Sequence, residues 1–262
     1  MSFTFCSIRH LFPLLDGFSD HDLSRLRARS CEKRFQPEEV LMRAQSCSGV
    51  VLFLMEGRVK IIADGDDGVP TVVAFCNAGQ VLGEINAYTG EGHSASVVAE
   101  TACVAWCFSI ENFLDCVATM PALNRNLLKI MAQRLSRMTK QVHVLATQHA
   151  DTRIVFNLLA VADEELKAIQ RRADETVVSK PPPQIIPTSA TVPISIQDLA
   201  SMSGCTREQT HRVLDAMKNE GIIERTHGKI RILDRDALKH FGKNREGGVN
   251  AENRLEELQN SL

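Results

Sequence analysis

The 262-residue sequence has little net charge and no long apolar run. No stretch approaches the roughly 20 apolar residues that a membrane-spanning helix needs. A formal charge of −2 is too small for a protein that coats nucleic acid by its total charge. The first residues do not form a charged region followed by an apolar one, so no signal peptide is expected. We therefore expect a cytoplasmic protein without a membrane partner.

The eight cysteines include no Cys-x-x-Cys pair, and the chain has no nucleophile elbow, Walker loop or metal triad. We therefore expect neither an enzyme nor a metal site. Cysteines scattered through a chain of this length in a reducing compartment are expected to remain thiols. Since 44% of the residues are hydrophobic, the chain can form more than one core.

Short apolar runs separated by glycines fill residues 35–110. Such runs between turn residues are typical of an antiparallel sandwich or barrel. Gly57 and Gly79 mark expected turns where a positive φ is tolerated, and residues 64–68 are expected to form a hairpin tip. The runs are 40–42, 50–55, 59–62, 69–75, 81–82, 95–99 and 102–108.

Apolar residues recur at alternating spacings of three and four after Pro121. Such a narrow stripe favours a helix that pairs with a second copy of itself, and the alternative is a helix packed on its own domain. A second helix is expected over 152–172. The proline-rich stretch 179–193 is expected to be a loop or linker, and residues 242–262 a polar, disordered tail. The stripe, which we call the seam, consists of Leu128, Met131, Leu135, Met138, Val142 and Leu145.

Residues 195–214 have the pattern of a helix–turn–helix. Ser195 and Thr206 can each cap a helix, and Gly204 supplies the tight turn between the two helices. An arginine can donate two hydrogen bonds to guanine, and a carboxylate can accept one from cytosine. The exposed face of the second helix is therefore predicted to read bases through Arg207, Glu208, His211 and Arg212.

Residues 221–233 are expected to form a wing, with two short strands around a His-Gly turn. Residues 195–245 hold ten Lys and Arg against seven Asp and Glu, so this region carries a net +3. Local clusters of cations provide affinity for phosphates. The residues predicted to contact DNA phosphates are Thr206, Arg225, Lys229 and Arg231.

These motifs resemble the CRP/FNR family of bacterial transcription regulators over about residues 10–235. The resemblance rests on 53–60, 79–84, 94–95, the long helix and 204–208 with Arg212. It implies an α+β fold with an N-terminal cyclic-nucleotide-binding-like β-roll, a long dimerisation helix and a C-terminal winged helix–turn–helix. The implied limits are 1–120 for the roll, 121–150 for the dimerisation helix, 151–240 for the DNA-binding domain and 241–262 for the tail.

The resemblance also implies a function and partners. The protein would act as a homodimer on a near-palindromic operator with TGTGA-type half-sites. Its partners would be double-stranded DNA, a second copy of the chain and RNA polymerase. Two recognition helices, about one DNA turn apart, would enter successive major grooves.

An effector pocket in the roll is a further implication of the resemblance. In cyclic-AMP-binding members a Gly-Glu pair meets the ribose and an Arg-Ser pair grips the cyclic phosphate. Here His93 stands at the place of that arginine, and Met138 replaces a threonine. An imidazole offers at most one donor to a phosphate, whereas a guanidinium offers a two-pronged fork. The implied pocket residues are Gly83, Glu84, His93, Ser94 and Thr139.

Several interpretations of the roll stay open, and no cofactor is assigned. The roll could bind a cyclic nucleotide through altered phosphate contacts, bind another small molecule, or have lost its ligand. An iron–sulfur sensor needs closely spaced cysteines, whereas Cys6 and Cys31 are isolated. A haem sensor would need an axial ligand such as His93, Cys76 or His10. A cyclic-nucleotide-type regulatory subunit that does not bind DNA would share the roll but lack the helix–turn–helix and wing.

Overall fold

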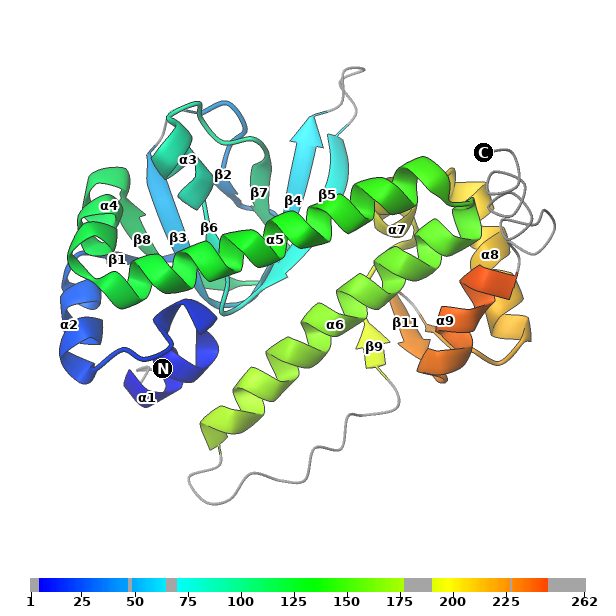
Figure 1. The fold of residues 1–262 in the computed structure, drawn as a ribbon. Coiled ribbons are helices and arrows are strands. Elements are labelled where there is room, and N and C mark those ends of the chain that lie inside the picture. The colour runs from blue at the N-terminus through cyan, green and yellow to red at the C-terminus, as the bar shows by residue number, and fades with distance from the viewer. Residues whose placement is uncertain (1–4, 47–48, 65–69, 177–189, 227, 245–262) are drawn as a thin grey trace, which may run out of the picture. The chain divides into compact units, whose positions relative to one another are not determined.

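A computed structural model describes residues 5–46, 49–64, 70–176, 190–226 and 228–244 (Figure 1). The chain forms two compact units. The first contains the chain up to Lys140 and the segment from Asp163, and the second contains Gln141–Ala162 and the chain from Ile186. The division therefore passes through two long helices, α5 (Pro121–Thr147) and α6 (Ala150–Thr176). The domain limits implied by the resemblance stay a prediction.

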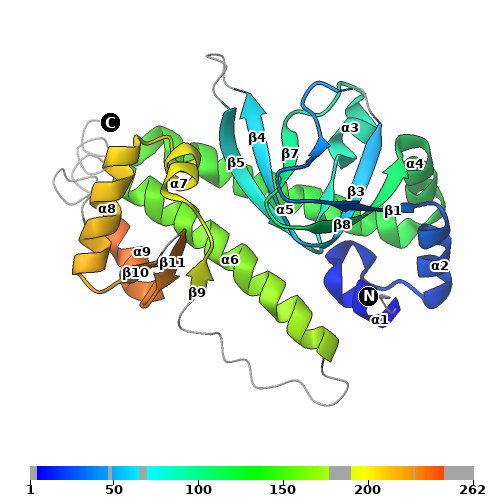
Figure 2. The same cartoon turned by 180° about the vertical axis from the view of Figure 1, so that it is seen from behind.

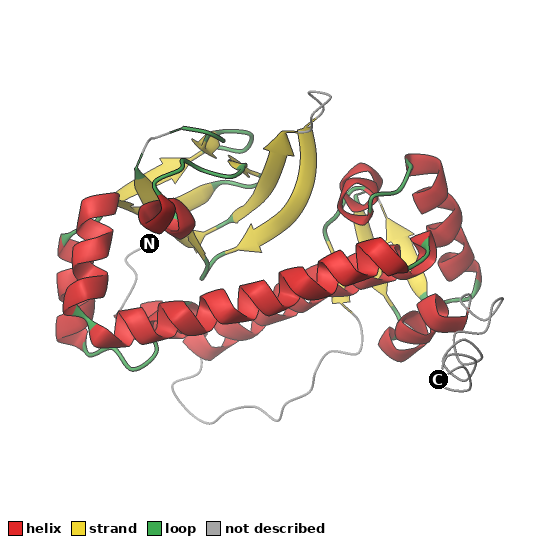
Figure 3. Ribbon diagram, turned by 45° about the horizontal axis from the view of Figure 1, so that its top comes forward, coloured by secondary structure: helices red, strands yellow, loops and turns green. Residues whose placement is uncertain are grey.

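Two four-stranded antiparallel sheets form the roll of the first unit (Figure 3). Their strand orders are β1-β8-β3-β6 and β2-β7-β4-β5. Each apolar run expected from the sequence coincides with one of the strands β2 to β8, so the prediction of an antiparallel sandwich or barrel is confirmed. The strands are β1 (Cys31–Phe35), β2 (Val40–Met42), β3 (Val50–Glu56), β4 (Arg58–Asp64), β5 (Pro70–Asn77), β6 (Val81–Leu82), β7 (Ser96–Ala99) and β8 (Cys103–Ser109).

Strands β3 and β8 are buried on both faces, because successive side chains of a strand point to opposite sides. In β3, Phe53 joins a core beneath the helices, whereas Leu52 and Leu54 join a second core with side chains of the other sheet. In the core beneath the helices, the ring centroids of Phe53 and Phe108 are 4.8 Å apart. The roll therefore has one core between its sheets and another beneath its helices.

Side chains from the helices complete the core that lies beneath them. Leu123 and Leu127 show that the first turns of α5 pack into it. Gly57 and Gly79 adopt φ values of +90° and +88°, which confirms the two expected turns. The hairpin tip expected over 64–68 lies mostly outside the described residues. The helices are α1 (Phe5–Leu11), the 3-10 helix η1 (Pro13–Leu15), α2 (Asp20–Ala28), α3 (Glu84–Thr89) and α4 (Ile110–Thr119).

The second unit is a winged helix–turn–helix that includes the first half of α6 (Figure 2). Its sheet has the antiparallel order β10-β11-β9. Buried apolar residues from α6, both helices of the motif and the wing form its core, among them Leu158, Leu199, Leu214 and Ile230. Its remaining elements are β9 (Ala190–Val192), α7 (Ile196–Ser203), α8 (Arg207–Asn219), β10 (Ile223–Thr226), β11 (Lys229–Ile232) and α9 (Arg235–Asn244).

Two expectations for this unit were wrong in part. The loop expected over 179–193 ends in strand β9, where Val192 pairs with Ile230 of β11, because backbone pairing can use even a three-residue segment between prolines. The start of the tail expected from residue 241 is instead the end of helix α9, which buries Leu238 and Phe241. The Asp234 carboxylate caps α9 by accepting hydrogen bonds from the Asp236 and Ala237 amides at 2.9 and 2.8 Å.

The prediction of a second long helix is confirmed. The helix expected over 152–172 is α6, which is longer at both ends. The remainder of the proline-rich stretch and residues 245–262 of the expected tail lie outside the described residues. Among the described helices, none has both the length and the apolar character that a membrane crossing requires.

Candidate functional site

The helix–turn–helix is held by caps at each helix end. Ser195 Oγ accepts a hydrogen bond from the Asp198 amide at 3.0 Å at the start of α7. Thr206 and Gln209 form a reciprocal capping box at the start of α8, with distances of 3.0 and 3.2 Å. Gly204, with φ +57°, closes the turn between the helices. The two caps and the turn expected from the sequence are therefore confirmed.

Helix α8 presents a charged face to solvent and an apolar face to its unit. Arg207, Glu208 and Arg212 are exposed, and His211 is partly exposed. Thr210, by contrast, is fully buried and donates to the Thr206 carbonyl at 3.0 Å. Thr210 therefore contributes to packing rather than to the reading surface. The side chains that anchor the helix are Val213, Leu214 and Met217.

Glu208 is held in the ionised form by its place in the first turn of α8. Hydrogen bonds from its own backbone amide and from Thr206 lower the pKa of its carboxyl group, and Arg207 and Arg212 add a favourable charge interaction. An ionised carboxylate only accepts hydrogen bonds. Glu208 is therefore an acceptor flanked by two arginine donors, which suits the edge of a cytosine beside guanines.

A groove of about 730 Å³ lies between α8, the start of α7 and the wing. Arg207, Lys218, Arg225 and Lys229 line it, and Asp215 is its one lining carboxylate among the described residues. A groove with this excess of positive charge suits a phosphate backbone. The structure thus brings Arg207, His211, Arg225 and Lys229 from the predicted DNA-contact set to one surface.

Two of the predicted phosphate contacts have partners within the protein. Arg225 Nη1 donates to Asp215 Oδ1 at 2.6 Å, which ties the wing to α8. Arg231 lies 3.6 Å from Glu224, its neighbour across the β10–β11 pair. Lys229 is exposed at the turn of the wing. A phosphate would have to compete with carboxylates for Arg225 and Arg231.

Asn157 of α6 is a supporting residue that sequence reasoning missed. It is buried, and its amide donates to the Met202 carbonyl at 3.1 Å and to Ser203 Oγ at 3.3 Å. These bonds attach the end of α7 to α6. An asparagine within an apolar helical stretch, between Phe156 and Leu158, is the signal that could have revealed it.

Three of the five implied effector residues, Gly83, Glu84 and His93, lie together at the start of α3. Gly83 adopts φ +83°, and a Cβ there would lie 2.5 Å from the Val50 carbonyl oxygen, so only glycine fits. Glu84 follows it and is 2% exposed. Its carboxylate forms an ion pair with Arg134 of α5. Burial raises the pKa of Glu84, although the charges of Arg134 and His93 oppose the shift.

Arg134 of α5 also belongs to this group, and no motif of the sequence indicates it. Besides pairing with Glu84, its guanidinium donates to the Val81 carbonyl at 2.8 Å. His93 is buried, and its ring lies 3.3 Å from the position of a Cβ on Gly83. The structure thus brings Glu84, His93 and Arg134 together. Ser94 and Thr139 are exposed, and Thr139 donates to its own helix at the Leu135 carbonyl.

The seam residues lie along α5, and five of them are exposed in the single chain. Met138, for example, is 62% exposed. Met131 differs, because it is partly buried against the core of the roll. The alternative of a helix packed on its own domain thus describes only the first turns of α5. The exposed members are Leu128, Leu135, Met138, Val142 and Leu145.

The seven cysteines that the structure describes are free thiols. Cys103 and Cys107 both face the core between the sheets. Desolvation raises the pKa of Cys107 to about 11 and that of Cys76 to about 12. A thiol that keeps its proton is a poor metal ligand. Across the described part of the chain, no group of three or more His, Cys, Asp or Glu residues is placed to hold a metal ion.

Comparison with protein families agrees with this architecture. The cyclic nucleotide-binding domain family matches residues 32–120, which form most of the roll. The Crp-like helix-turn-helix domain family matches residues 166–241, which include the motif and the wing.

Individual relatives cover most of the chain. The cAMP-activated global transcriptional regulator Vfr of Pseudomonas aeruginosa is 24% identical over 215 residues, covering 80% of this chain and 92% of that one. The cAMP-activated global transcriptional regulator CRP of Salmonella typhimurium is 23% identical over 201 residues, covering 76% and 88%. These relatives are transcription regulators rather than enzymes.

A solved structure shares the fold. The c-di-GMP responsive global regulator CLP of Xanthomonas campestris gives a TM-score of 0.64 at 20% identity, covering 82% of this chain and 99% of that one. The roll, the long helix and the winged motif thus occur together in a known regulator fold. The chain belongs to the CRP/FNR family and is a DNA-binding transcription regulator with a cyclic nucleotide-binding domain.

Proposed function

We propose that the protein acts as a homodimer on a near-palindromic operator with TGTGA-type half-sites. The observation that carries this proposal is the exposed group Arg207, Glu208 and Arg212 at the start of α8. The first turn of a recognition helix is the part that enters the major groove. The neighbouring cationic groove supplies phosphate contacts, and such contacts fix the register of the helix on the duplex.

Dimer formation through α5 is supported by its exposed seam. Apolar side chains at heptad spacing on an otherwise polar helix are stabilised when a second helix covers them. A pair of α5 helices would relate two α8 helices by a dyad, which a palindromic operator requires. RNA polymerase is the further partner that we propose, because a regulator of this family acts on transcription.

The test is a gel shift of an operator carrying two TGTGA-type half-sites, at about 0.1 M salt, together with light scattering of the free protein. The wild type is expected to be dimeric and to shift the operator. Met138→Asp places two like charges in the seam and should abolish both properties. Ser136→Asp, at an exposed position of α5 outside the seam, is the control and should preserve both. Unchanged operator affinity in Met138→Asp would contradict the dimer proposal.

For the roll, we propose that no cyclic nucleotide is held with the phosphate contacts of cyclic-AMP-binding members. His93 is buried at the place where those members carry an arginine, and it offers a single donor. Calorimetry with cyclic AMP, cyclic GMP and cyclic di-GMP tests this proposal. Tight binding of any of the three that persists in His93→Ala would show that another group holds the phosphate.

A further inference from the structure

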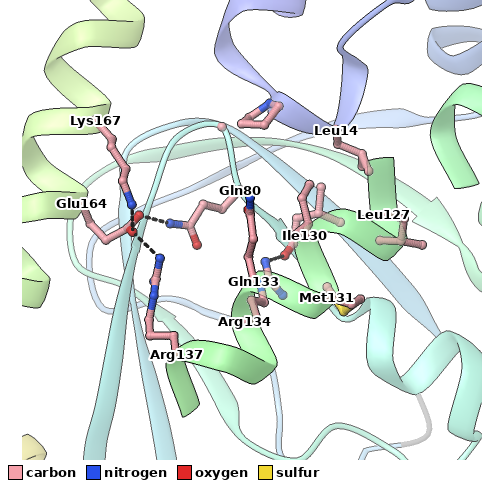
Figure 4. Close-up of a pocket in the computed structure, with 13 residues that line it drawn as sticks. Leu14, Gln80, Leu127, Ile130, Met131, Gln133, Arg134, Arg137, Glu164 and Lys167 are labelled. Atoms are coloured by element: carbon pink, nitrogen blue, oxygen red, sulfur yellow. Dashed lines mark hydrogen bonds and ion pairs between the residues drawn. The ribbon is translucent and has the colours of Figure 1, made fainter. Parts of the chain in front are cut away.

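A second pocket shares Arg134 with the group at the start of α3 but is not lined by Glu84 or His93. It has a volume of about 400 Å³ and lies between η1, the turn before β6, α5 and α6 (Figure 4). Small-molecule sites have volumes of about 300–1,000 Å³. All of its lining residues belong to the first unit. The pocket is therefore large enough for a small ligand.

One end of the pocket is apolar. Leu14 and Leu127 are buried members of the core beneath the helices, and Ile130 and Met131 pack against that core from α5. Figure 4 shows these four side chains on the same side of the pocket. An aliphatic group placed there would extend the core and leave water.

The other end already holds a carboxylate, which is that of Glu164 from α6. Its oxygens accept hydrogen bonds from Gln80 Nε2 at 2.8 Å and Lys167 Nζ at 3.0 Å, and Arg137 Nη2 lies 2.9 Å away. We call Gln80, Arg137 and Lys167 the donor cluster. The Glu164 side chain is 13% exposed, so this carboxylate is largely removed from water. The cluster therefore has the chemistry and spacing of a carboxylate site (Figure 4).

The charges of this region do not cancel. Arg134, Arg137 and Lys167 line the pocket, and Glu164 is its one lining carboxylate among the described residues. Glu84 neutralises Arg134 from the neighbouring site. One positive charge remains, and it is shared between Arg137 and Lys167. A ligand with one negative charge would balance it.

We propose that this pocket binds a small amphipathic carboxylate with an unbranched aliphatic chain of about eight to ten carbons. Its carboxylate joins Arg137 and Lys167 at the donor cluster as Glu164 rotates away, and its chain lies against Ile130 and Met131. The bidentate fork of an arginine favours a carboxylate over a hydroxyl group or a cation. This site goes beyond the proposed function, and its binding can be measured without DNA.

The test is calorimetry of the full chain with decanoate, kept below the concentration at which it forms micelles. Decanol is the neutral analogue and decyltrimethylammonium the cationic one. Decanoate is expected to bind once per chain, and both analogues should bind much more weakly. Glu164→Gln removes the negative charge that competes for the donor cluster and should tighten decanoate binding about tenfold, since a hydrogen bond to a charged group contributes about 1.5–3 kcal/mol.

Variants of the donor cluster complete the test. Arg137→Gln and Lys167→Gln should each weaken decanoate binding about tenfold. Lys129→Gln removes an exposed cation of α5 outside the pocket and should leave binding unchanged. Absence of saturable binding in both the wild type and Glu164→Gln would overturn the proposal. Equal binding of decanol, or an equal loss in Lys129→Gln and Arg137→Gln, would overturn it as well.

Discussion

Two glutamates in the first turns of helices show how differently the two units use charge. Glu84 begins α3 in the roll, where it is 2% exposed and paired with Arg134. Glu208 lies in the first turn of α8, where its carboxylate faces solvent. Burial raises the pKa of the first, whereas hydrogen bonds at a helix start lower the pKa of the second. The same residue type in the same local position thus has opposite properties.

The difference fits the partners that we propose for the two units. A base-reading surface is reached by a large, hydrated partner, so its donors and acceptors have to be exposed and already charged. A small-molecule pocket is enclosed, and its charged groups are stabilised by pairing with one another until a ligand arrives. Glu84 with Arg134 and Glu164 with Arg137 are such pairs in the first unit. A ligand of the first unit would therefore compete with intramolecular partners, whereas DNA at α8 would compete mainly with water.

The largest effect is expected from a pair of glycine variants that probes this contrast in packing. Gly83→Ala combines φ +83° with a Cβ 2.5 Å from the Val50 oxygen, so it should lower the free energy of unfolding of the roll by about 2–5 kcal/mol. Gly204→Ala has φ +57° and no neighbour closer than 3.4 Å, so it should cost about 1–2 kcal/mol. Fluorescence of the single tryptophan, Trp106 in the roll core, and circular dichroism report the two transitions. Equal costs would refute the contrast.

The next effect concerns base reading by α8. Arg207→Ala should cost about 1–3 kcal/mol of affinity for a TGTGA-type operator and relax base preference at one position of the half-site. Lys229→Ala, at the turn of the wing, should instead weaken binding to all sequences alike and reduce the salt dependence. Affinity for an operator and for scrambled DNA at several salt concentrations separates the two. A uniform loss in Arg207→Ala would show that Arg207 contacts phosphate rather than bases.

The sequence predicted local features of both units well. The strands β2 to β8, the caps at Ser195 and Thr206 and the turn at Gly204 follow from patterns spanning a few residues. Strand β1 was missed because, in its sequence CEKRF, only Phe35 is buried. Strand β9 was missed because its three residues, which lie just before Pro193, are too few to show a periodicity.

The long-range ion pairs and hydrogen bonds of the first unit could not be predicted in this way. Arg134 meets Glu84 across 50 positions of sequence, and Gln80 meets Glu164 across 84. Before the fold is known, Arg134 and Arg137 are only polar residues beside the seam. The exposed base-reading face needed no such information, because its residues are neighbours on a single helix. A site formed by neighbouring residues of one helix can therefore be recognised from the sequence, whereas a site formed by residues far apart in the sequence cannot.

A smaller effect is expected at Asp215, which faces the cationic groove and holds Arg225 at 2.6 Å. Asp215→Asn removes the negative charge nearest the proposed phosphate path and releases Arg225. Affinity for DNA of any sequence should rise a few-fold, and the salt dependence should steepen by about one ion. Glu220→Gln, at an exposed carboxylate just beyond α8, is the matched control and should change neither. Weaker binding in Asp215→Asn would mean that Asp215 positions Arg225 for contact.

The smallest effect is expected in how the free energy of unfolding depends on pH through Glu84 and Glu208. This dependence tests the contrast between the buried and the exposed glutamate directly. The folded-state pKa of Glu84 lies above the ordinary 4.5, so its contribution to the free energy of unfolding is complete below 4.5 and is lost as pH rises through the folded-state value. For Glu208 the pKa lies below 4.5, so its contribution is complete above 4.5 and is lost as pH falls.

Urea midpoints of the wild type, Glu84→Gln and Glu208→Gln across acidic and neutral pH measure both signs. The wild type should lose stability relative to Glu84→Gln as pH rises, and relative to Glu208→Gln as pH falls. Because Glu208 is exposed to solvent, its difference should be the smaller of the two. Differences of the same sign would mean that the two carboxylates share one environment, and the division between a closed pocket and an open reading surface would then fail.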